Sequence, residues 1–240
     1  MSLFSTARPD TATDMLCAME HASRFNRWMA DTILPFVRGD VLEIGAGIGN
    51  LTRLLYPHSS SYILTDVNPE HLNRAMQLLA GHEKLSSAIC DVTRSADFEP
   101  FREKMDTVIC LNVLEHVAND LDGLRNIYSA LRPGGRAIIL VPQGPGAFGS
   151  FDRILGHFRR YTKQELTNKM IAAGFVLEHL FAFNRATYPG WLLNSKLLKR
   201  RRLSRIQLAM FDRMVPIIRR LDAYLPWPAT SLIAICRRPS

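Results

Sequence analysis

The sequence lacks a hydrophobic run long enough for a membrane-spanning helix. Such a helix needs about 18 consecutive apolar residues. No stretch of the 240-residue chain approaches that length, although 47% of the residues are apolar. The segment Met1 to Ser5 also lacks the charged region and apolar stretch of a secretory signal. We therefore expect a cytoplasmic protein. A length of 240 residues fits one α/β domain, so we also expect a single domain over residues 1–240.

Cysteine is scarce and scattered. The four cysteines stand at positions 17, 90, 110 and 236, and no two of them have the C-x-x-C spacing. This pattern argues against a zinc site or a disulfide framework, so we expect buried free thiols and no metal. The chain also has no internal repeat and no low-complexity tract.

The positive charge is concentrated late in the chain. The net charge is +8, and residues 184–229 contain ten lysines and arginines but two aspartates, so the rest of the chain is neutral overall. We call residues 184–229 the basic insertion. Its apolar residues have helical spacing over 204–225, where Pro216 should break or kink the helix.

A glycine-rich turn follows the first predicted strand, residues 41–44. Glycine at positions 45, 47 and 49 permits positive φ and close approach of a ligand to the main chain. A second apolar run, 62–65, ends at Asp66, about twenty residues on, where an acid that binds ribose hydroxyls is expected. In open α/β sheets such strand ends bind the ligand.

The string E-x-G-x-G-x-G at residues 43–49 resembles motif I of the class I S-adenosylmethionine-dependent methyltransferases, in particular their bacterial small-molecule type. The resemblance implies a three-layer α/β/α Rossmann-like fold. Its seven-stranded sheet is mostly parallel, with an antiparallel last strand and a helical insertion before that strand. It also implies S-adenosyl-L-methionine as cofactor and S-adenosyl-L-homocysteine as product. The cofactor-binding residues would be Glu43, Gly45, Ala46, Gly47, Gly49, Asp66, Val67, Asp91, Val92, Leu111 and Asn112.

Three later motifs resemble the same family. Strand 106–111 is followed by Leu-Glu-His at 114–116, the phrase LRPGG precedes strand 137–142, and GHFRRYT at 156–162 is similar to a bacterial branch. Within one domain we expect a cap helix at 15–37, a cofactor-binding core at 38–183, the basic insertion on the substrate side, and a last strand in 230–240. Further strands are expected at 85–90 and 175–183, and helices at 69–79, 120–131 and 163–173.

Two histidines and several substrate-side residues are candidates for the reaction. His116 and His157 are predicted catalytic bases, because imidazole titrates near neutral pH. A structural role for each histidine is the alternative. The predicted substrate-binding residues are Phe25, Trp28, Arg159, Arg160 and Tyr161, and the two arginines suit an anionic or phosphate-bearing acceptor.

We expect a methyltransferase with a small-molecule acceptor, and oxygen is favoured as the nucleophile. A nicotinamide-dependent reductase is disfavoured, because the sequence has no Tyr-x-x-x-Lys pair and the glycine spacing differs. A nucleic-acid methyltransferase would suit the basic insertion, but an Asn/Asp-Pro-Pro-aromatic motif is missing after the fourth strand.

Two further alternatives stay open. The basic insertion could contact an anionic membrane, at about 1 kcal/mol per basic residue, while the enzyme acts on a lipid-linked or glycan intermediate. A non-catalytic protein that binds the cofactor is less favoured.

Overall fold

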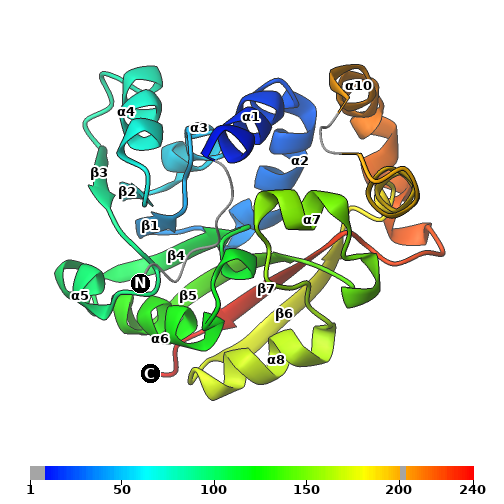
Figure 1. Ribbon diagram of the computed structural model, residues 1–240. Coiled ribbons are helices and arrows are strands. Elements are labelled where there is room, and N and C mark those ends of the chain that lie inside the picture. Colours follow the sequence, from blue (N-terminus) through cyan, green and yellow to red (C-terminus); the bar gives the residue numbers. More distant parts are fainter. Residues whose placement is uncertain (1–8, 201–203) are drawn as a thin grey trace.

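The computed structural model describes residues 9–200 and 204–240 and contains a seven-stranded sheet with helices on both faces (Figure 1). The strand order is β3-β2-β1-β4-β5-β7-β6, and β7 runs antiparallel to its neighbours β5 and β6. The strands are β1 (Asp40–Ile44), β2 (Ser61–Asp66), β3 (Leu85–Ile89), β4 (Met105–Leu111), β5 (Leu131–Pro142), β6 (Val176–Phe183) and β7 (Ser231–Arg237). This topology confirms the Rossmann-like fold predicted from the sequence.

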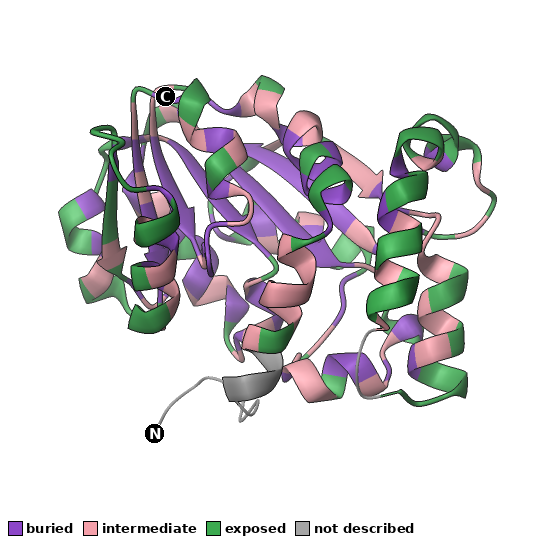
Figure 2. Cartoon of the chain, turned by 90° about the horizontal axis from the view of Figure 1, so that it is seen from above, coloured by how far each residue is buried: buried purple, intermediate pink, exposed green. Residues whose placement is uncertain are grey.

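The central strands are mostly apolar because both of their faces are covered. Successive residues of β4 point to opposite faces: Val108 and Cys110 join the hydrophobic cluster beneath one helical layer, and Ile109 joins the cluster beneath the other. Figure 2 shows that the strands are largely buried, whereas the helices carry exposed residues on their outer faces. The sheet therefore separates two cores.

The helices divide between the two faces of the sheet (Figure 1). One face carries α2 (Ser23–Ile33), α3 (Thr52–Leu55), α4 (Pro69–Leu78) and α10 (Arg205–Leu221), and the other carries α5 (Ser95–Phe98), α6 (Asp120–Ala130) and α8 (Lys163–Ala172). Other helical elements include α1 (Pro9–Glu20), α7 (Ser150–Leu155), α9 (Tyr188–Trp191), the 3-10 turn η4 (Leu114–His116) and the π-helix η6 (Leu192–Leu197). In residues 9–200 and 204–240, no helix combines the length and the apolar character needed to cross a bilayer.

The N-terminal segment forms two helices where the sequence predicted one over 15–37. Helix α1 ends at Glu20, and α2 begins at Ser23 after Ala22, whose ψ of 59° is not helical. The Asn26 side chain donates a hydrogen bond to the carbonyl of Met19 and so stabilises the break. Helix α1 contacts α7, while α2 packs along α10 (Figure 1).

The helix expected at 204–225 is continuous through Pro216 as α10 and ends at Leu221. Proline removes one backbone donor from a helix. Here the helix is retained because its inner face packs against α2 and the core, with Val215 1% exposed beside the proline. Arg201 and Arg202, part of the predicted basic cluster, lie outside the described residues.

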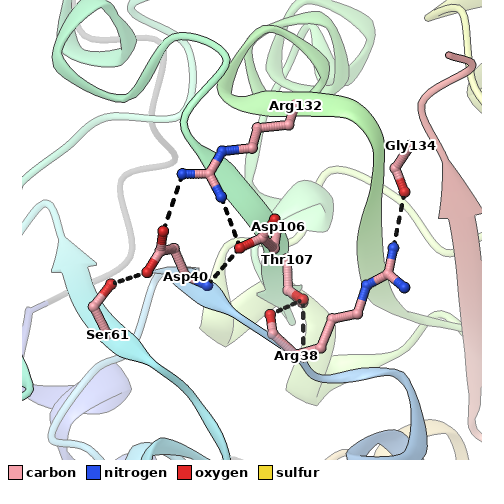
Figure 3. A network of polar contacts seen from close by, with 7 residues as sticks. All are labelled: Arg38, Asp40, Ser61, Asp106, Thr107, Arg132 and Gly134. Carbon is pink, nitrogen blue, oxygen red and sulfur yellow. Dashed lines mark hydrogen bonds and ion pairs between the residues drawn. The ribbon is translucent and has the colours of Figure 1, made fainter.

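A polar network ties the starts of three strands together (Figure 3). Arg132 at the start of β5 contacts Asp40 of β1 at 3.0 Å and Asp106 of β4 at 2.9 Å, and Asp106 also accepts a hydrogen bond from the Asp40 amide. Gly39 sits against this network with φ +62°. The network lies at the end of the sheet opposite the glycine-rich turn.

We expect Gly39→Ala to lower the free energy of unfolding by about 2–4 kcal/mol. A Cβ on Gly39 would lie 2.1 Å from the Asp106 carboxylate, and its positive φ adds strain of about 1–2 kcal/mol. The matched control is Gly81→Ala, which has φ +87° but open space around the added Cβ. Urea denaturation of both variants measures the difference, and equal losses would contradict the steric account.

Candidate active site

The glycine-rich turn joins the end of β1 to α3 in a conformation that side chains would oppose. The φ angles of Gly45, Gly47 and Gly49 are +70°, +56° and +81°. A Cβ on Gly45 would lie 2.4 Å from the Val113 side chain, and one on Gly49 would lie 3.2 Å from Ala75. The turn is thus closely packed: Gly47 and Gly49 are buried, and only glycine leaves room for these neighbours. Ala46 is buried and donates its amide to the Thr65 carbonyl, which ties the turn to β2.

Asp66 ends β2 directly beside this turn. Its carboxylate accepts hydrogen bonds from the Gly47 amide at 2.8 Å and the Asn68 amide at 2.9 Å, and His71 lies 3.6 Å away. Val67, which follows, is exposed. The two amides fix the carboxylate at the sheet edge, where the family's ribose-binding acid would be needed.

Glu43 supports the turn from within the protein. Its buried carboxylate accepts hydrogen bonds from the hydroxyls of Thr52, at 2.6 Å, and Tyr62, at 2.8 Å. Burial raises the pKa of Glu43, and the two hydroxyl groups oppose that shift. These bonds connect β1 to α3 and β2. Contact of Glu43 with the cofactor stays a prediction.

The ends of β3 and β4 complete the same edge. After β3, Asp91 accepts hydrogen bonds from the Thr93 amide and hydroxyl, and Val92 is buried against α6. After β4, the buried Leu111 is followed by Asn112, which is exposed with φ +56°. Such a φ is rare outside glycine and is often found at functional sites. The register of the parallel strands places these ends beside the glycine turn.

Helix α1 lies over the glycine-rich turn. The Leu16 carbonyl accepts a hydrogen bond from the Asn50 side chain, and the Leu16 methyl groups approach within 3.1 Å of the position of a Cβ on Gly47. An ion pair of 2.6 Å between Glu20 and Arg74 fastens α1 to α4. Of the predicted cap helix over 15–37, only the start, which belongs to α1, lies over the turn in these contacts. A ligand on Gly47 would contact Leu16.

A second group of polar residues lies beyond the end of β4. Glu115, His116 and His157 present donor atoms that all lie within 4.8 Å of one another, and the two imidazole rings meet edge to face with centroids 4.6 Å apart. The Glu115 side chain is buried, and neither of its carboxylate oxygens has a hydrogen-bond partner. The structure thus brings together the two histidines predicted as bases and adds a carboxylate.

Burial dominates the proton affinities in this group. It raises the pKa of Glu115 to about 7, against the opposing effects of His157 and Arg160. Burial, together with His157, lowers the pKa of His116 to about 4, although a hydrogen bond to the Leu155 backbone opposes this shift. At neutral pH His116 is therefore an uncharged imidazole with a lone pair available on one nitrogen.

Asp152 in α7 orients the neighbouring side chains. Its fully buried carboxylate contacts His157 Nδ1 at 2.9 Å and Arg160 Nε at 2.7 Å, and it also accepts the Gly149 amide. Burial opposes its ionisation, but these three partners together lower the pKa of Asp152. The ionised carboxylate holds Nδ1 of His157 as the donor, which leaves Nε2 as the basic nitrogen.

The predicted substrate-binding residues of the GHFRRYT segment make internal contacts. The Arg160 guanidinium stacks on Trp191 at 4.3 Å and is itself buried. Arg159 and the Tyr161 hydroxyl both contact the buried Asp120, at 3.0 Å and 2.7 Å. These contacts fix the segment against α6 and the basic insertion. A direct contact of the three residues with substrate stays a prediction.

The two aromatic residues predicted on the substrate side are also packed. The Phe25 and Trp28 rings both contact Phe183, with centroids 5.9 Å and 4.6 Å away, and Phe25 contacts Phe211 of α10. The Phe25 amide donates a hydrogen bond to Asp212. These contacts attach α2 to α10. Contact of the two rings with an acceptor stays a prediction.

Glu115 and Asp152 are members of this group that were not predicted from the sequence. Glu115 lies within the quoted Leu-Glu-His motif, and its position beside His116 was an available signal. Asp152 follows a glycine-rich stretch and had no such signal, because its partners become neighbours only when α7 folds back on residues 157–160.

Comparison with known proteins agrees with this geometry. A family described as "Methyltransferase domain" matches residues 42–137. The highly reducing polyketide synthase ctvA of Aspergillus terreus is 32% identical over 123 residues, which cover 49% of this chain and 5% of that protein. An uncharacterized methyltransferase-like protein of Schizosaccharomyces pombe is 26% identical over 55% of this chain and 49% of its own length. The chain thus spans only about 5% of the length of curated relatives such as ctvA and half of others.

Solved structures share the fold. An S-adenosylmethionine-dependent methyltransferase from Mesorhizobium loti aligns with a TM-score of 0.60 at 18% identity, over 88% of this chain and 96% of its own. The phosphoethanolamine N-methyltransferase 2 of Haemonchus contortus, in complex with S-adenosyl-L-methionine, aligns with a TM-score of 0.63 at 16% identity, over 90% of this chain and 53% of its own. At this identity the likeness concerns the fold alone.

We expect Asp66→Ala to weaken binding of S-adenosylhomocysteine by tenfold to a hundredfold. The variant removes a charged acceptor that could hold two ribose hydroxyls, a loss of about 1.5–3 kcal/mol. Calorimetric titration measures the affinity, and NADH and NADPH serve as negative controls that should not bind. Asp122→Ala, at an exposed position of α6, is the control and should bind as the wild type does. Unchanged affinity in Asp66→Ala would contradict the cofactor site.

Proposed function

Residues 42–137 belong to a class I S-adenosylmethionine-dependent methyltransferase domain, and from this premise we propose that the chain methylates a small-molecule acceptor, most readily at an oxygen. The cofactor of this domain class is S-adenosyl-L-methionine, whose sulfonium supplies an activated methyl group. The observation that carries the proposal is the shared edge of β1, β2, β3 and β4, where a glycine turn and two strand-end aspartates meet. We further propose one domain in which residues 184–229 form the acceptor side.

The chain's own residues would position the acceptor and accept its proton. Alignment of a nucleophile with the methyl group can supply about 7–11 kcal/mol of the barrier. A hydroxyl acceptor must also lose its proton, and His157 Nε2 is oriented for this by the Asp152 carboxylate on Nδ1. Because an oriented base is available in His157, a hydroxyl oxygen is favoured as the nucleophile.

We expect His116→Ala and His157→Ala to lower the rate of methyl transfer by about 10²- to 10⁴-fold, the usual contribution of a general base. The assay follows release of S-adenosylhomocysteine in the presence of a panel of phenolic compounds. His58→Ala, at an exposed position in the turn before β2, is the control and should keep the wild-type rate.

The melting temperature of each variant decides between catalytic and structural roles. A lower rate with an unchanged melting temperature supports the base. A loss of stability that matches the loss of rate contradicts it. If no member of the panel is methylated while S-adenosylhomocysteine binds, the preference for a phenolic oxygen is wrong.

A second candidate function is methylation of a lipid-linked acceptor at an anionic membrane surface, and α10 favours it. Five large apolar residues of this helix are exposed by 52–73%: Ile206, Met210, Met214, Ile217 and Leu221. At about 100° per residue they fall within an arc of about 80°. We call them the outer stripe. Arg213 and Arg220 border it on one side by the same geometry.

The opposite face of α10 accounts for its attachment to the protein. Leu208, Phe211, Val215 and Ile218 pack against the hydrophobic cluster that also contains α2. The outer stripe is therefore not needed for that packing. An apolar stripe with arginines beside it is typical of helices that lie in the interface of anionic membranes.

A basic cavity beside the outer stripe supports the same candidate. It has a volume of about 720 Å³ between α2, α3 and α10. Its lining includes Arg24, Arg27, Arg53, Arg219 and Arg220. Arg24 and Arg219 pair with Asp212 and Asp31, so five guanidinium groups face two carboxylates. The surplus of positive charge would attract phosphate groups of lipids on the cytoplasmic leaflet.

We expect the protein to sediment with phosphatidylglycerol vesicles and not with phosphatidylcholine vesicles. Ile217→Glu should weaken this binding at least tenfold, because burial of one such side chain contributes about 1.5–3 kcal/mol. The control is Ile171→Glu on α8, where isoleucine is equally exposed, at 61% against 62%. Equal binding of both variants, or of both vesicle types, would contradict the membrane contact.

A further inference from the structure

We propose that Glu115, His116 and His157 form a binding site for one divalent transition-metal ion of the zinc type. The three side chains come from η4 and from the segment after α7, and one donor atom of each lies within 4.8 Å of the other two. In a tetrahedral zinc site with bonds of about 2.0–2.1 Å, ligand atoms are separated by about 3.3 Å. Side-chain shifts of about 1 Å or slightly more would therefore bring the three ligands onto one ion.

The carboxylate provides the strongest reason to place a cation here. Glu115 is 1% exposed, and both of its oxygens lack a hydrogen-bond partner among the described residues. An unpartnered buried polar group costs about 1–3 kcal/mol, and more if charged. A cation bonded to one oxygen removes that cost. No hydrogen bond among the described residues compensates the burial of the Glu115 carboxylate. A role as a metal ligand therefore explains its position.

Both histidines are held as metal-ligating histidines usually are. The second ring nitrogen of such a residue commonly donates to a carboxylate or a backbone carbonyl, which fixes the ring and its tautomer. His157 Nδ1 is fixed by Asp152 at 2.9 Å, and the His116 ring is hydrogen-bonded to the Leu155 backbone. Each ring therefore keeps one nitrogen free, and these are the donors of the cluster.

The charges around the cluster also suit a cation. Arg160 is the nearby positive group, but its Nε lies 2.7 Å from Asp152, so these two buried charges pair with each other. The Glu115 charge is left without a direct partner. Two neutral imidazoles and one carboxylate are the ligand set of catalytic zinc sites that leave a position open. The same set can hold other divalent transition metals.

The ion site stands independently of the proposed function, but its use in methyl transfer rests on that function. A bound ion can act as a Lewis acid and lower the pKa of a coordinated hydroxyl. On this account the two histidines assist deprotonation of the acceptor through the ion they hold.

The test is calorimetric titration of the untagged full-length protein with zinc chloride after removal of metals with EDTA and dialysis. We expect one equivalent per chain, and a d–d absorption band when cobalt(II) replaces zinc. Glu115→Gln preserves the shape of the side chain and removes the charge, so it should fold. It and His157→Ala should bind zinc at least tenfold more weakly.

Two control variants separate this site from other zinc ligands. His58→Ala removes an exposed histidine, and Cys17→Ser removes the cysteine that is not fully buried. Both should keep the one equivalent. Absence of a stoichiometric zinc site, or wild-type affinity in both Glu115→Gln and His157→Ala, would overturn the proposal.

Titration with S-adenosylhomocysteine in the same samples distinguishes the two proposals. If S-adenosylhomocysteine binds and zinc does not, the metal site is disproved and the proposed function is unaffected. Zinc binding without binding of the cofactor product would support the metal site and contradict the proposed function. Circular dichroism of each variant verifies that it is folded before either titration.

Discussion

The whole site depends on the pairing of β1 with β2 on one side and β4 on the other. β1 pairs in parallel with β2 on one side and with β4 on the other. The helices that connect the strands on these two sides cover opposite faces of the sheet, so a crevice forms at the carboxyl ends of β1 and β4. The glycine turn, Asp66, Asp91 and Asn112 all follow these strands or β3 and therefore share one edge. The network around Arg132 fastens the other end of the same strands (Figure 3). Packing at one end of these strands thus holds the glycine turn at their other end in place.

Beyond this edge, two buried carboxylates organise the proposed acceptor side. Asp120 gathers Arg159, Tyr161 and Lys169, and Asp152 gathers His157 and Arg160. A buried charge is retained only when partners compensate its lost hydration. Both aspartates meet this condition, and Glu115 does not. That contrast is the physical basis for the inferred ion site.

Helix α10 combines two different apolar faces. One face attaches the helix to α2 and the core, and the outer stripe remains exposed beside a cavity rich in arginine. The basic insertion is therefore part of the fold on its inner side and a candidate contact surface on its outer side. Of its basic residues, Arg219 and Arg220 line the cavity beside α2.

The sequence by itself determined the sheet, the glycine turn and the strand-end acids, because periodicity and the φ requirements of glycine act over a few residues. It also predicted a helix at 163–173, where α8 lies with a capping box formed by Thr162 and Glu165. Only the tertiary structure decided the break between α1 and α2, the continuity of α10 through Pro216, and the meeting of Glu115 with His116 and His157. These features depend on contacts between distant segments, such as Phe25 with Asp212 and Asp152 with Arg160. Local patterns contain no information about such contacts, since the energies that decide them arise only when the chain is packed.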